Sequence, residues 1–179
     1  MDSNIKNKLV IFGAAEIASL AKYYFENDSD YEVVAFTVDD SYCESDTFEG
    51  LPLIPWSQVH KKFPPSDFNM HVALSYMKLN QLRQEKYKQA KAANYNLVSY
   101  VSTKSATWPD LRIGDNCFIL ENQTIQPTCK IGNNVMLWSG NHIGHGTEID
   151  DHAYLASHVV VAGHCNIGKR CFIGVNATL

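Results

Sequence analysis

The chain has 179 residues, of which 45% are hydrophobic and 19% are charged. Such a chain is long enough to bury one or two modest cores and too short for a large multidomain assembly. Its formal net charge of -4 excludes a protein built to neutralise a nucleic-acid backbone. Its longest apolar runs, at residues 9–12 and 159–162, fall far short of the roughly 18 to 20 residues that cross a membrane.

The N-terminal segment carries charges on both sides of a short apolar run, and it has no signal-peptide layout. We therefore expect a cytoplasmic protein without membrane insertion. The five cysteines form an odd set without C-x-x-C spacing, which argues against a disulfide framework and against a zinc site made of cysteines alone.

The first hundred residues alternate between apolar runs typical of buried strands and amphipathic or polar runs typical of helices. Strands are predicted at 8–13, 31–38, 71–75 and 97–101, and helices at 13–25 and 80–93. Four prolines punctuate the segment between the second and third strands. Short connections between alternating elements predict a small Rossmann-like parallel sheet, which we place in a domain of residues 1–106.

The turn after the first strand is a degenerate form of the dinucleotide-binding fingerprint. Gly13 supplies its first glycine and Ala14 follows, but Ala15 replaces the second glycine and hinders close approach of a pyrophosphate. The following helix still offers free N–H groups to a phosphate. Three hypotheses stay open for this turn: it binds a nucleotide sugar or other small ligand, which we favour, it binds an NAD-type cofactor, or it binds no ligand.

Ligands of such sheets bind beyond the carboxyl ends of the strands. This rule makes Asp39, Asp40, Ser75 and Tyr76 candidate lining residues for a substrate, beside Gly13 and its neighbours. The alternative for the two aspartates is a solvated turn.

The C-terminal part repeats with a period of six residues. Stepping by six, every position is aliphatic: Ile113, Ile119, Ile125, Ile131, Leu137, Ile143, Ile149, Leu155, Val161, Ile167, Ile173 and Leu179. Helices repeat near 3.6 residues and pleated strands near 2, so neither explains this pattern. A triangular coil does, because one hexapeptide on each flat face gives a turn of about 18 residues with its aliphatic side chains inside.

Small residues surround the aliphatic positions of this coil. Most residues that directly follow an aliphatic position are Gly, Ala or Asp, and the slot four residues after it holds small fillers. Four of the five cysteines occupy that slot, which predicts buried packing: Cys117, Cys129, Cys165 and Cys171. Because solenoids end in polar caps and this chain ends at an aliphatic position, we expect the domain of residues 107–179 to be incomplete.

Five histidines cluster between residues 142 and 164. The geometry argues against a metal site within one chain, because His152, His158 and His164 take the same place on three successive faces and point in different directions. We therefore expect no metal, with an intersubunit zinc site as the alternative. His145 lies between two glycines that leave its imidazole accessible, which favours a general base. His142 and His158 are secondary candidates for which structural or interface contacts are favoured.

The hexapeptide pattern resembles that of left-handed β-helix acyltransferases. The segments 137–145, 149–152, 161–163 and 171–177 further resemble bacterial sugar acyltransferases of the sialic acid O-acetyltransferase (NeuD-like) and amino-sugar N-acetyltransferase (PglD-like) group. Members of that group also join a small Rossmann-like domain to a left-handed β-helix. The resemblance therefore spans nearly the whole chain.

The resemblance implies specific roles for residues of the coil. It implies a catalytic base at His145, acetyl-CoA between neighbouring β-helices of a homotrimer, and a Gly163 N–H that meets the thioester carbonyl. The coenzyme contacts expected on this basis are Gly163, Ala162, Tyr154 and Gly174. Many relatives have a glutamate directly after the histidine, where this chain has Gly146, and Glu148 and Asp150 are the candidates to replace it.

The resulting functional hypothesis is an acetyl-CoA-dependent acyltransferase that N-acetylates a nucleotide-linked amino sugar for surface glycan synthesis. Direct transfer with a histidine base requires no acyl-enzyme, which agrees with cysteines in packing positions. Two alternatives stay open: an O-acetyltransferase for sialic acid or another sugar, and a non-catalytic binding or assembly module.

Overall fold

The computed structural model describes residues 7–179. The N-terminal segment that was compared with a signal peptide lies partly outside the described residues, because it includes residues 1–6. The described chain divides into two compact units. One contains residues up to Leu74 together with Lys88–Val98, and the other contains Ser75–Tyr87 together with Ser99–Leu179. Each unit is described below by itself.

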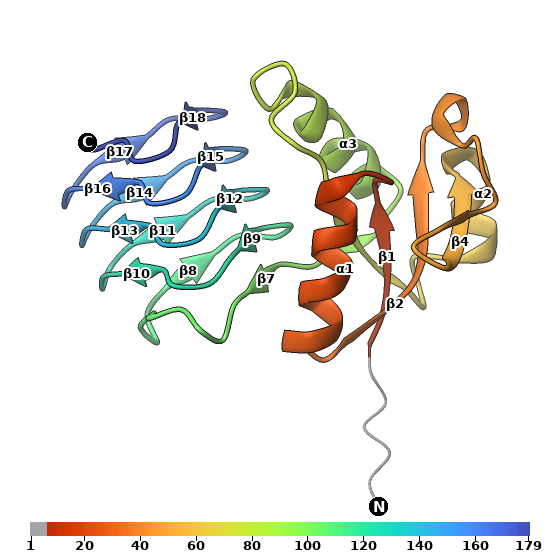
Figure 1. Ribbon diagram of the computed structural model, residues 1–179, viewed down its shortest axis with the longest axis horizontal. Helices are drawn as coiled ribbons and strands as arrows, with labels where there is room; N and C mark the ends of the chain where they lie inside the picture. The colour runs from red at the N-terminus through yellow and green to blue at the C-terminus, as the bar shows by residue number, and fades with distance from the viewer. Residues whose placement is uncertain (1–6) are drawn as a thin grey trace, which may run out of the picture. The chain divides into compact units, whose positions relative to one another are not determined.

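The first unit is built on a six-stranded sheet with the strand order β3-β4-β2-β1-β5-β6. Figure 1 labels β1, β2 and β4 of this sheet. All its neighbouring strands are parallel except the antiparallel pair β3 and β4. This confirms the predicted N-terminal α/β region with a mostly parallel sheet. Its elements are β1 (Asn7–Phe12), α1 (Glu16–Asp28), β2 (Tyr31–Val38), the 3-10 helix η1 (Asp40–Tyr42), β3 (Thr47–Phe48), β4 (Leu51–Pro55), α2 (Trp56–Lys62), β5 (Asn69–Val72), β6 (Asn96–Leu97) and the last part of α3 (Gln81–Ala92).

Hydrophobic periodicity explains how these elements pack. Residues 9–12 of β1 are all buried, as expected for a central strand with both faces covered. Helix α1 buries Ala18, Ala21 and Phe25, which share one face at helical spacing. The proline-rich segment contains more structure than predicted, because Pro52 and Pro55 are accommodated in β4 and Pro55 then precedes the first turn of α2.

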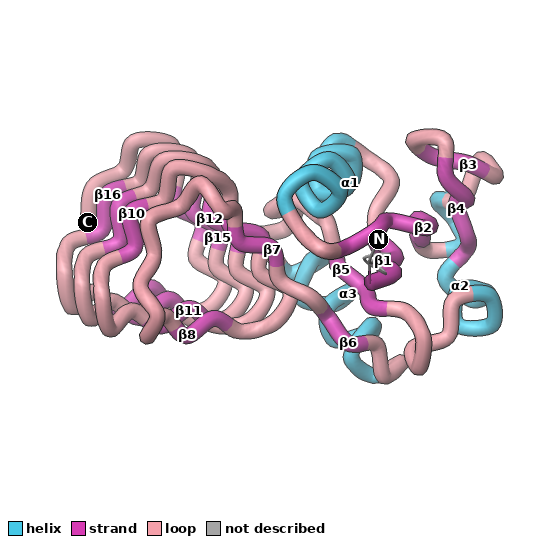
Figure 2. The backbone as a smooth tube through the Cα atoms, turned by 90° about the horizontal axis from the view of Figure 1, so that it is seen from below, coloured by secondary structure: helices cyan, strands magenta, loops and turns pink. Residues whose placement is uncertain are grey.

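The second unit is a left-handed parallel β-helix, as predicted. Figure 2 looks roughly along its axis and shows the successive turns superimposed. Its two-residue strands are β7 (Tyr100–Val101), β8 (Arg112–Ile113), β9 (Phe118–Ile119), β10 (Thr124–Ile125), β11 (Lys130–Ile131), β12 (Met136–Leu137), β13 (His142–Ile143), β14 (Glu148–Ile149), β15 (Tyr154–Leu155), β16 (Val160–Val161), β17 (Asn166–Ile167) and β18 (Phe172–Ile173).

The strands of the coil form three parallel sheets, one for each side of the triangle. We name each side after one of its strands. The β13 face consists of β10, β13 and β16, the β14 face of β8, β11, β14 and β17, and the β15 face of β7, β9, β12, β15 and β18. Paired residues lie 18 positions apart, as in the pair His142 and Val160, so each coil takes three hexapeptides.

The aliphatic ladder forms the core of the coil. Its nine central members, from Ile119 to Val161 and Ile167, are buried, whereas Ile113 and Ile173 are partly buried and Leu179 is exposed. The filler positions follow the prediction in three cases, since Cys117 and Cys129 are buried and Cys165 packs partly buried against the core. The prediction is wrong for Cys171, which is exposed in the last described coil.

Every corner of the coil has the same backbone conformation. The third residue after each aliphatic position from Ile113 to Ile173 has a positive φ, between 54° and 83°. Glycine, asparagine and histidine adopt this left-handed region more readily than most residues do. The corner residues are Asn116, Asn122, Thr128, Asn134, Gly140, Gly146, His152, His158, His164, Arg170 and Asn176. The six-residue spacing of three of the histidines is therefore a property of the corners.

Residues 75–87 are part of the same compact unit as the coil, and Arg83 joins the two. Its buried guanidinium donates to the backbone carbonyls of Asn134, His152 and Ala153, which belong to the corners of two successive coils. The buried Asn80 accepts from Arg83 at 3.1 Å and donates to the Arg170 carbonyl of the next coil at 3.1 Å. Burial lowers the pKa of Arg83 to about 10, so the group stays charged at neutral pH.

The division of the described chain into two compact units differs from the predicted domain boundary between residues 106 and 107. The predicted fourth strand over residues 97–101 is two strands: β6 pairs with β5 in the first sheet, whereas β7 pairs with β9 in the coil. The sequence does not distinguish them because both are short apolar runs of the kind that either sheet accepts.

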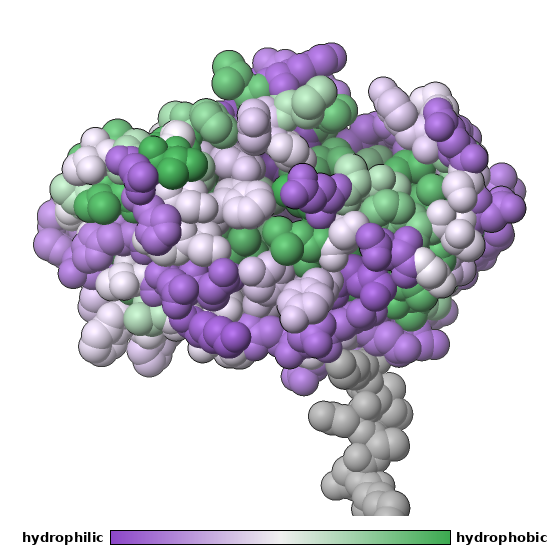
Figure 3. Space-filling view, viewed as in Figure 1, coloured by the Kyte–Doolittle hydropathy of each residue, from purple (hydrophilic) through white to green (hydrophobic). Residues whose placement is uncertain are grey.

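Among residues 7–179, no helix is long and apolar enough to cross a membrane. On the face in view in Figure 3, hydrophilic residues are interspersed with hydrophobic ones. Several large apolar side chains are nevertheless exposed in the second unit, including Tyr76, Met77, Leu79 and Phe172.

Candidate active site

His145 lies at the edge of the β13 face, two residues after the end of β13. Its side chain is exposed, whereas Gly144 before it is buried. The corner residue Gly146 has a φ of +67° and makes room for the ring of His164, which a Cβ at that position would approach to 2.6 Å. The two glycines thus let the chain turn closely beside the next coil while the imidazole of His145 stays in contact with solvent.

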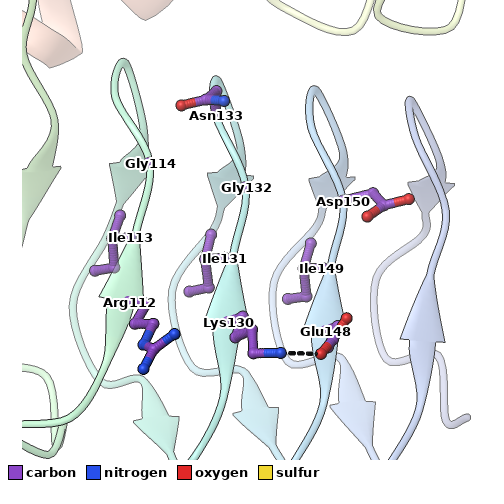
Figure 4. Close-up of a pocket in the computed structure, with 10 residues that line it drawn as sticks. All are labelled: Arg112, Ile113, Gly114, Lys130, Ile131, Gly132, Asn133, Glu148, Ile149 and Asp150. Atoms are coloured by element: carbon purple, nitrogen blue, oxygen red, sulfur yellow. Dashed lines mark hydrogen bonds and ion pairs between the residues drawn. The ribbon is translucent and has the colours of Figure 1, made fainter.

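Gln126 is the hydrogen-bond partner of His145. Its Oε1 lies 2.8 Å from the backbone nitrogen of His145 and 3.2 Å from the ring Nδ1. The expectation that Glu148 or Asp150 orients the ring is wrong. Both project from the β14 face, where Glu148 forms an ion pair with Lys130 (Figure 4).

Gly163 lies directly beside the ring of His145. A Cβ on Gly163 would come within 2.8 Å of the ring Cε1 and 3.0 Å of Nδ1. Ala162, the residue before it, is exposed on the same face. Within the described residues, the hydrogen bonds of this region include none donated by the Gly163 N–H, whereas Ala162 and His164 both donate to neighbouring coils. The structure therefore brings together His145, Ala162, Gly163 and an N–H group available to a ligand.

A second histidine borders the site. The ring of His164 lies edge-on to that of His145, with 4.8 Å between centroids and 85° between planes. The backbone N–H of His164 also donates to the carbonyl of His145 at 2.8 Å. His142 lies on β13 between Thr124 and Val160, and His158 packs over Gly140. Among the described residues there is no group of three or more His, Cys, Asp or Glu that would hold a metal ion.

Tyr154 and Gly174 are not on the face that carries His145. Tyr154 belongs to the β15 face and is buried, with its ring 5.2 Å from that of Tyr76 and 5.3 Å from that of Phe172. Burial raises the pKa of the Tyr154 hydroxyl. Gly174 follows β18 and is exposed. Of the four expected coenzyme contacts, only Ala162 and Gly163 adjoin His145.

In the first unit, the predicted turn joins the ends of two neighbouring strands. Gly13 has a φ of +134°, and a Cβ there would lie 2.6 Å from the carbonyl oxygen of Ala73 just after β5, so only glycine fits. Ala14 follows, and Ala15 precedes the first turn of α1 without a side-chain cap. The chain crosses from β2 and β4 on one side of β1 to β5 and β6 on the other, the topology that places ligands beyond these strand ends.

The remaining substrate candidates have different surroundings. The backbone N–H of Ser57 in the first turn of α2 donates to Asp40 Oδ1 at 3.0 Å. Hydrogen bonds from the side chain of Ser57 and from its backbone lower the pKa of the Asp40 carboxyl. Asp40 thus serves the start of a helix, whereas Asp39 directly precedes η1. Ser75 belongs to the second compact unit, in which it lies next to Tyr76.

A separate depression of about 360 Å³ lies on the β14 face. Figure 4 shows Arg112, Lys130 and Glu148 in a row along one side of it, with the glycines of two coils opposite. The row mixes both signs of charge, and Lys130 is already paired with Glu148. This depression does not include His145.

The repeat region matches the bacterial transferase hexapeptide (six repeats) family over residues 110–145 and 128–163. No curated protein matches the sequence significantly.

Solved structures match the hexapeptide coil together with the N-terminal unit. The acetyltransferase domain of PglB from Neisseria gonorrhoeae has a TM-score of 0.83 at 19% identity, over 97% of this chain and 82% of that chain. WeeI from Acinetobacter baumannii has a TM-score of 0.60 at 15% identity, over 97% and 94%. PerB from Caulobacter crescentus has a TM-score of 0.56 at 14% identity, over 94% and 92%. At these identities the matches establish the fold.

Sequence reasoning missed Gln126 and Arg83. Gln126 stands in the slot directly after an aliphatic position, one coil and one residue before His145. The 18-residue period contained this signal, because it places position 126 beside the start of the 144–146 turn in the next coil. Arg83 carried no such signal, since it lies in a polar helix outside the repeat.

Proposed function

We propose that this protein transfers an acetyl group from acetyl-CoA to the amino group of a nucleotide-linked sugar. The observation that carries the proposal is the exposed imidazole of His145 beside the unused backbone N–H of Gly163, on a coil of transferase hexapeptides. A base and an oxyanion donor side by side are what acyl transfer to an amine requires.

The mechanism follows from these two groups. The sugar nitrogen attacks the thioester carbonyl, forming a C–N bond and a tetrahedral oxyanion, while His145 takes the proton that the nitrogen loses. The N–H of Gly163 donates to the oxyanion, where negative charge develops. Collapse of the intermediate breaks the C–S bond, and the imidazolium returns its proton to the departing thiolate of coenzyme A. The enzyme ends in its starting state, with no acyl group on the protein.

Two structures support the donor and the acceptor class. A structure of the PglB acetyltransferase domain contains acetyl coenzyme A, and one of PerB contains CoA and GDP-perosamine. We further infer that the N-terminal unit is Rossmann-like, that the turn at Gly13 receives the acceptor's phosphates, and that the chain belongs to the NeuD-like and PglD-like group. The position of Gly13 at the strand ends where the sheet changes direction supports the phosphate site. We also infer a homotrimer in which each β13 face is completed by a neighbouring coil.

The test is thiol release from acetyl-CoA across UDP-, dTDP- and GDP-linked amino sugars, with the matching hydroxy sugars as the second arm. We expect release with one amino sugar, accompanied by an acetamide product in mass spectrometry. Release with hydroxy sugars alone would show an O-acetyltransferase. Acetyl-CoA binding without release from any sugar would favour a binding module and would contradict the proposal.

A side chain at Gly163 is expected to disturb the reaction without unfolding the coil. In Gly163→Ala the new Cβ would stand 2.8 Å from Cε1 of His145, so the ring must move. We expect thiol release to fall about 10-fold to 100-fold, because displacements of this size misalign a base. The matched control is Gly168→Ala, whose Cβ would meet only Cys171 Sγ at 3.9 Å. Equal rates for both variants would contradict the placement of Gly163 in the site.

A further inference from the structure

Two hydrogen bonds converge on one atom of Gln126. Its Oε1 lies 2.8 Å from the backbone nitrogen of His145 and 3.2 Å from the ring Nδ1. The backbone of Gln126 is itself held, because its N–H donates to the carbonyl of Ile143 at 3.0 Å, in the coil that carries His145. The side chain is half-buried, so it reaches His145 from a fixed origin.

The first hydrogen bond determines the chemistry of the second. A backbone N–H only donates, so the amide atom that faces it is the oxygen and not the NH₂ group. An amide oxygen only accepts, so the ring nitrogen that faces it carries a hydrogen. In the neutral imidazole that leaves the lone pair on Nε2, the nitrogen that is free to take a proton.

We propose that Gln126 is a positioning residue that holds His145 as the Nδ1–H tautomer with Nε2 as the base. The inference rests on the proposed function for its catalytic meaning, although the tautomer itself is a property of the unliganded protein. Carboxylates commonly orient a catalytic histidine, and their charge stabilises the imidazolium. The neutral amide of Gln126 supplies the orientation without that charge.

Two other histidines lie near His145 in space or in the sequence. His164 lies edge-on to its ring, and His142 lies three residues earlier on β13. No carboxylate of the described residues is hydrogen-bonded or ion-paired to its ring, and Glu148 is paired with Lys130. A carboxylate introduced at position 126 would thus be the acidic partner of the His145 ring. Substituting His142 and His164 in turn would separate the effect of this carboxylate from the effects of the two histidines.

The decisive experiment is nitrogen NMR of the imidazoles in the full chain without coenzyme, in native protein, Gln126→Glu and Gln126→Leu. We expect His145 to be the Nδ1–H tautomer in native protein and in Gln126→Glu. We expect Gln126→Leu to lose that preference and to gain the Nε2–H form. The midpoint of the His145 titration is expected at higher pH in Gln126→Glu than in native protein, because the carboxylate favours the imidazolium.

Kinetics supply the second readout. We expect Gln126→Leu to lower kcat about tenfold at unchanged KM for acetyl-CoA, because part of the general-base contribution is lost. Gln126→Glu should restore most of kcat and move the acid limb of the pH–rate profile to higher pH. The matched control is Gln58→Leu, an exposed glutamine of α2, which should leave the His145 spectrum and the profile unchanged.

An Nε2–H tautomer in native protein, or an unchanged tautomer in Gln126→Leu, would overturn the proposal. A purely structural role of Gln126 would lower stability without moving the tautomer or the titration midpoint, and this also would overturn it. Failure of the acyltransferase function is distinguishable, since the tautomer shift would then appear without any thiol release in native protein.

Discussion

Replacement of His145 by alanine is expected to lower thiol release from acetyl-CoA by about 100-fold or more, since general bases contribute on the order of 10² to 10⁴ in rate. The structural reason is that His145 is the exposed imidazole that adjoins the free N–H of Gly163. Its exposure also means that alanine opens no cavity in the coil. The measurement is the steady-state rate with the best acceptor from the sugar panel, together with the thermal midpoint of each protein.

The control for this variant is His60→Ala, which removes an exposed histidine from the last turn of α2. It should retain the full rate. A loss of less than about threefold in His145→Ala, with the thermal midpoint unchanged, would remove His145 from the base role and direct attention to His142 or His164.

Replacement of Arg83 by methionine is expected to lower the free energy of unfolding by about 3 kcal/mol. Methionine preserves the bulk of the side chain, but it leaves the carbonyls of Asn134, His152 and Ala153 without their buried donor. A buried polar group that loses its partner costs about 1 to 3 kcal/mol. For a chain of this length the expected fall in Tm is roughly 6 to 12 °C.

Lys88→Met is the matched control, because it removes an exposed positive charge from the same helix. Its Tm should stay within about 1 °C of the native value, as is usual for surface substitutions. A fall of less than about 2 °C in Arg83→Met would show that water replaces the guanidinium at the corner carbonyls. Denaturant unfolding followed by circular dichroism checks both variants.

The coil was predictable because its signal is one-dimensional. An aliphatic residue at every sixth position needs no knowledge of distant contacts, and the burial of Ile119, Leu137 and Val161 confirms the prediction. Their neighbours at the corners are equally regular, and the histidine cluster is partly explained by them. Cys171 departs from the pattern because the burial of a filler depends on the coil around it as well as on its slot.

Contacts that cross from one coil to another were harder to predict. The acid expected to orient His145 was sought nearby in sequence, at Glu148 and Asp150, whereas the observed partner comes from the preceding coil. Adjacent residues at a strand project to different sides, so closeness in sequence does not imply contact. The roles of His145 and Gly163 stay predictions until the variants are measured.

In the N-terminal unit, the central strands and two helices were predictable and the sheet edge was not. Strand β4 contains Pro52 and Pro55, residues that argue against a strand when read locally. The strand forms because its pairing with β2 uses residues 53–55 while β3 covers its first half. Likewise, the contact of Asp40 with the first turn of α2 was not predictable, because only the folded chain brings the two together.

The 18-residue period of the three-sided coil determines what an insertion or a deletion does to the residues that follow it. Removing 18 residues takes out one complete turn, so every later side chain returns to the face it had before. Removing six residues rotates all later hexapeptides by one face. Between residues 145 and 163 such a deletion would preserve the aliphatic core yet carry Gly163 away from the ring of His145. A change in length by a multiple of six that is not a multiple of 18 can therefore leave the fold intact and still separate the residues of the site.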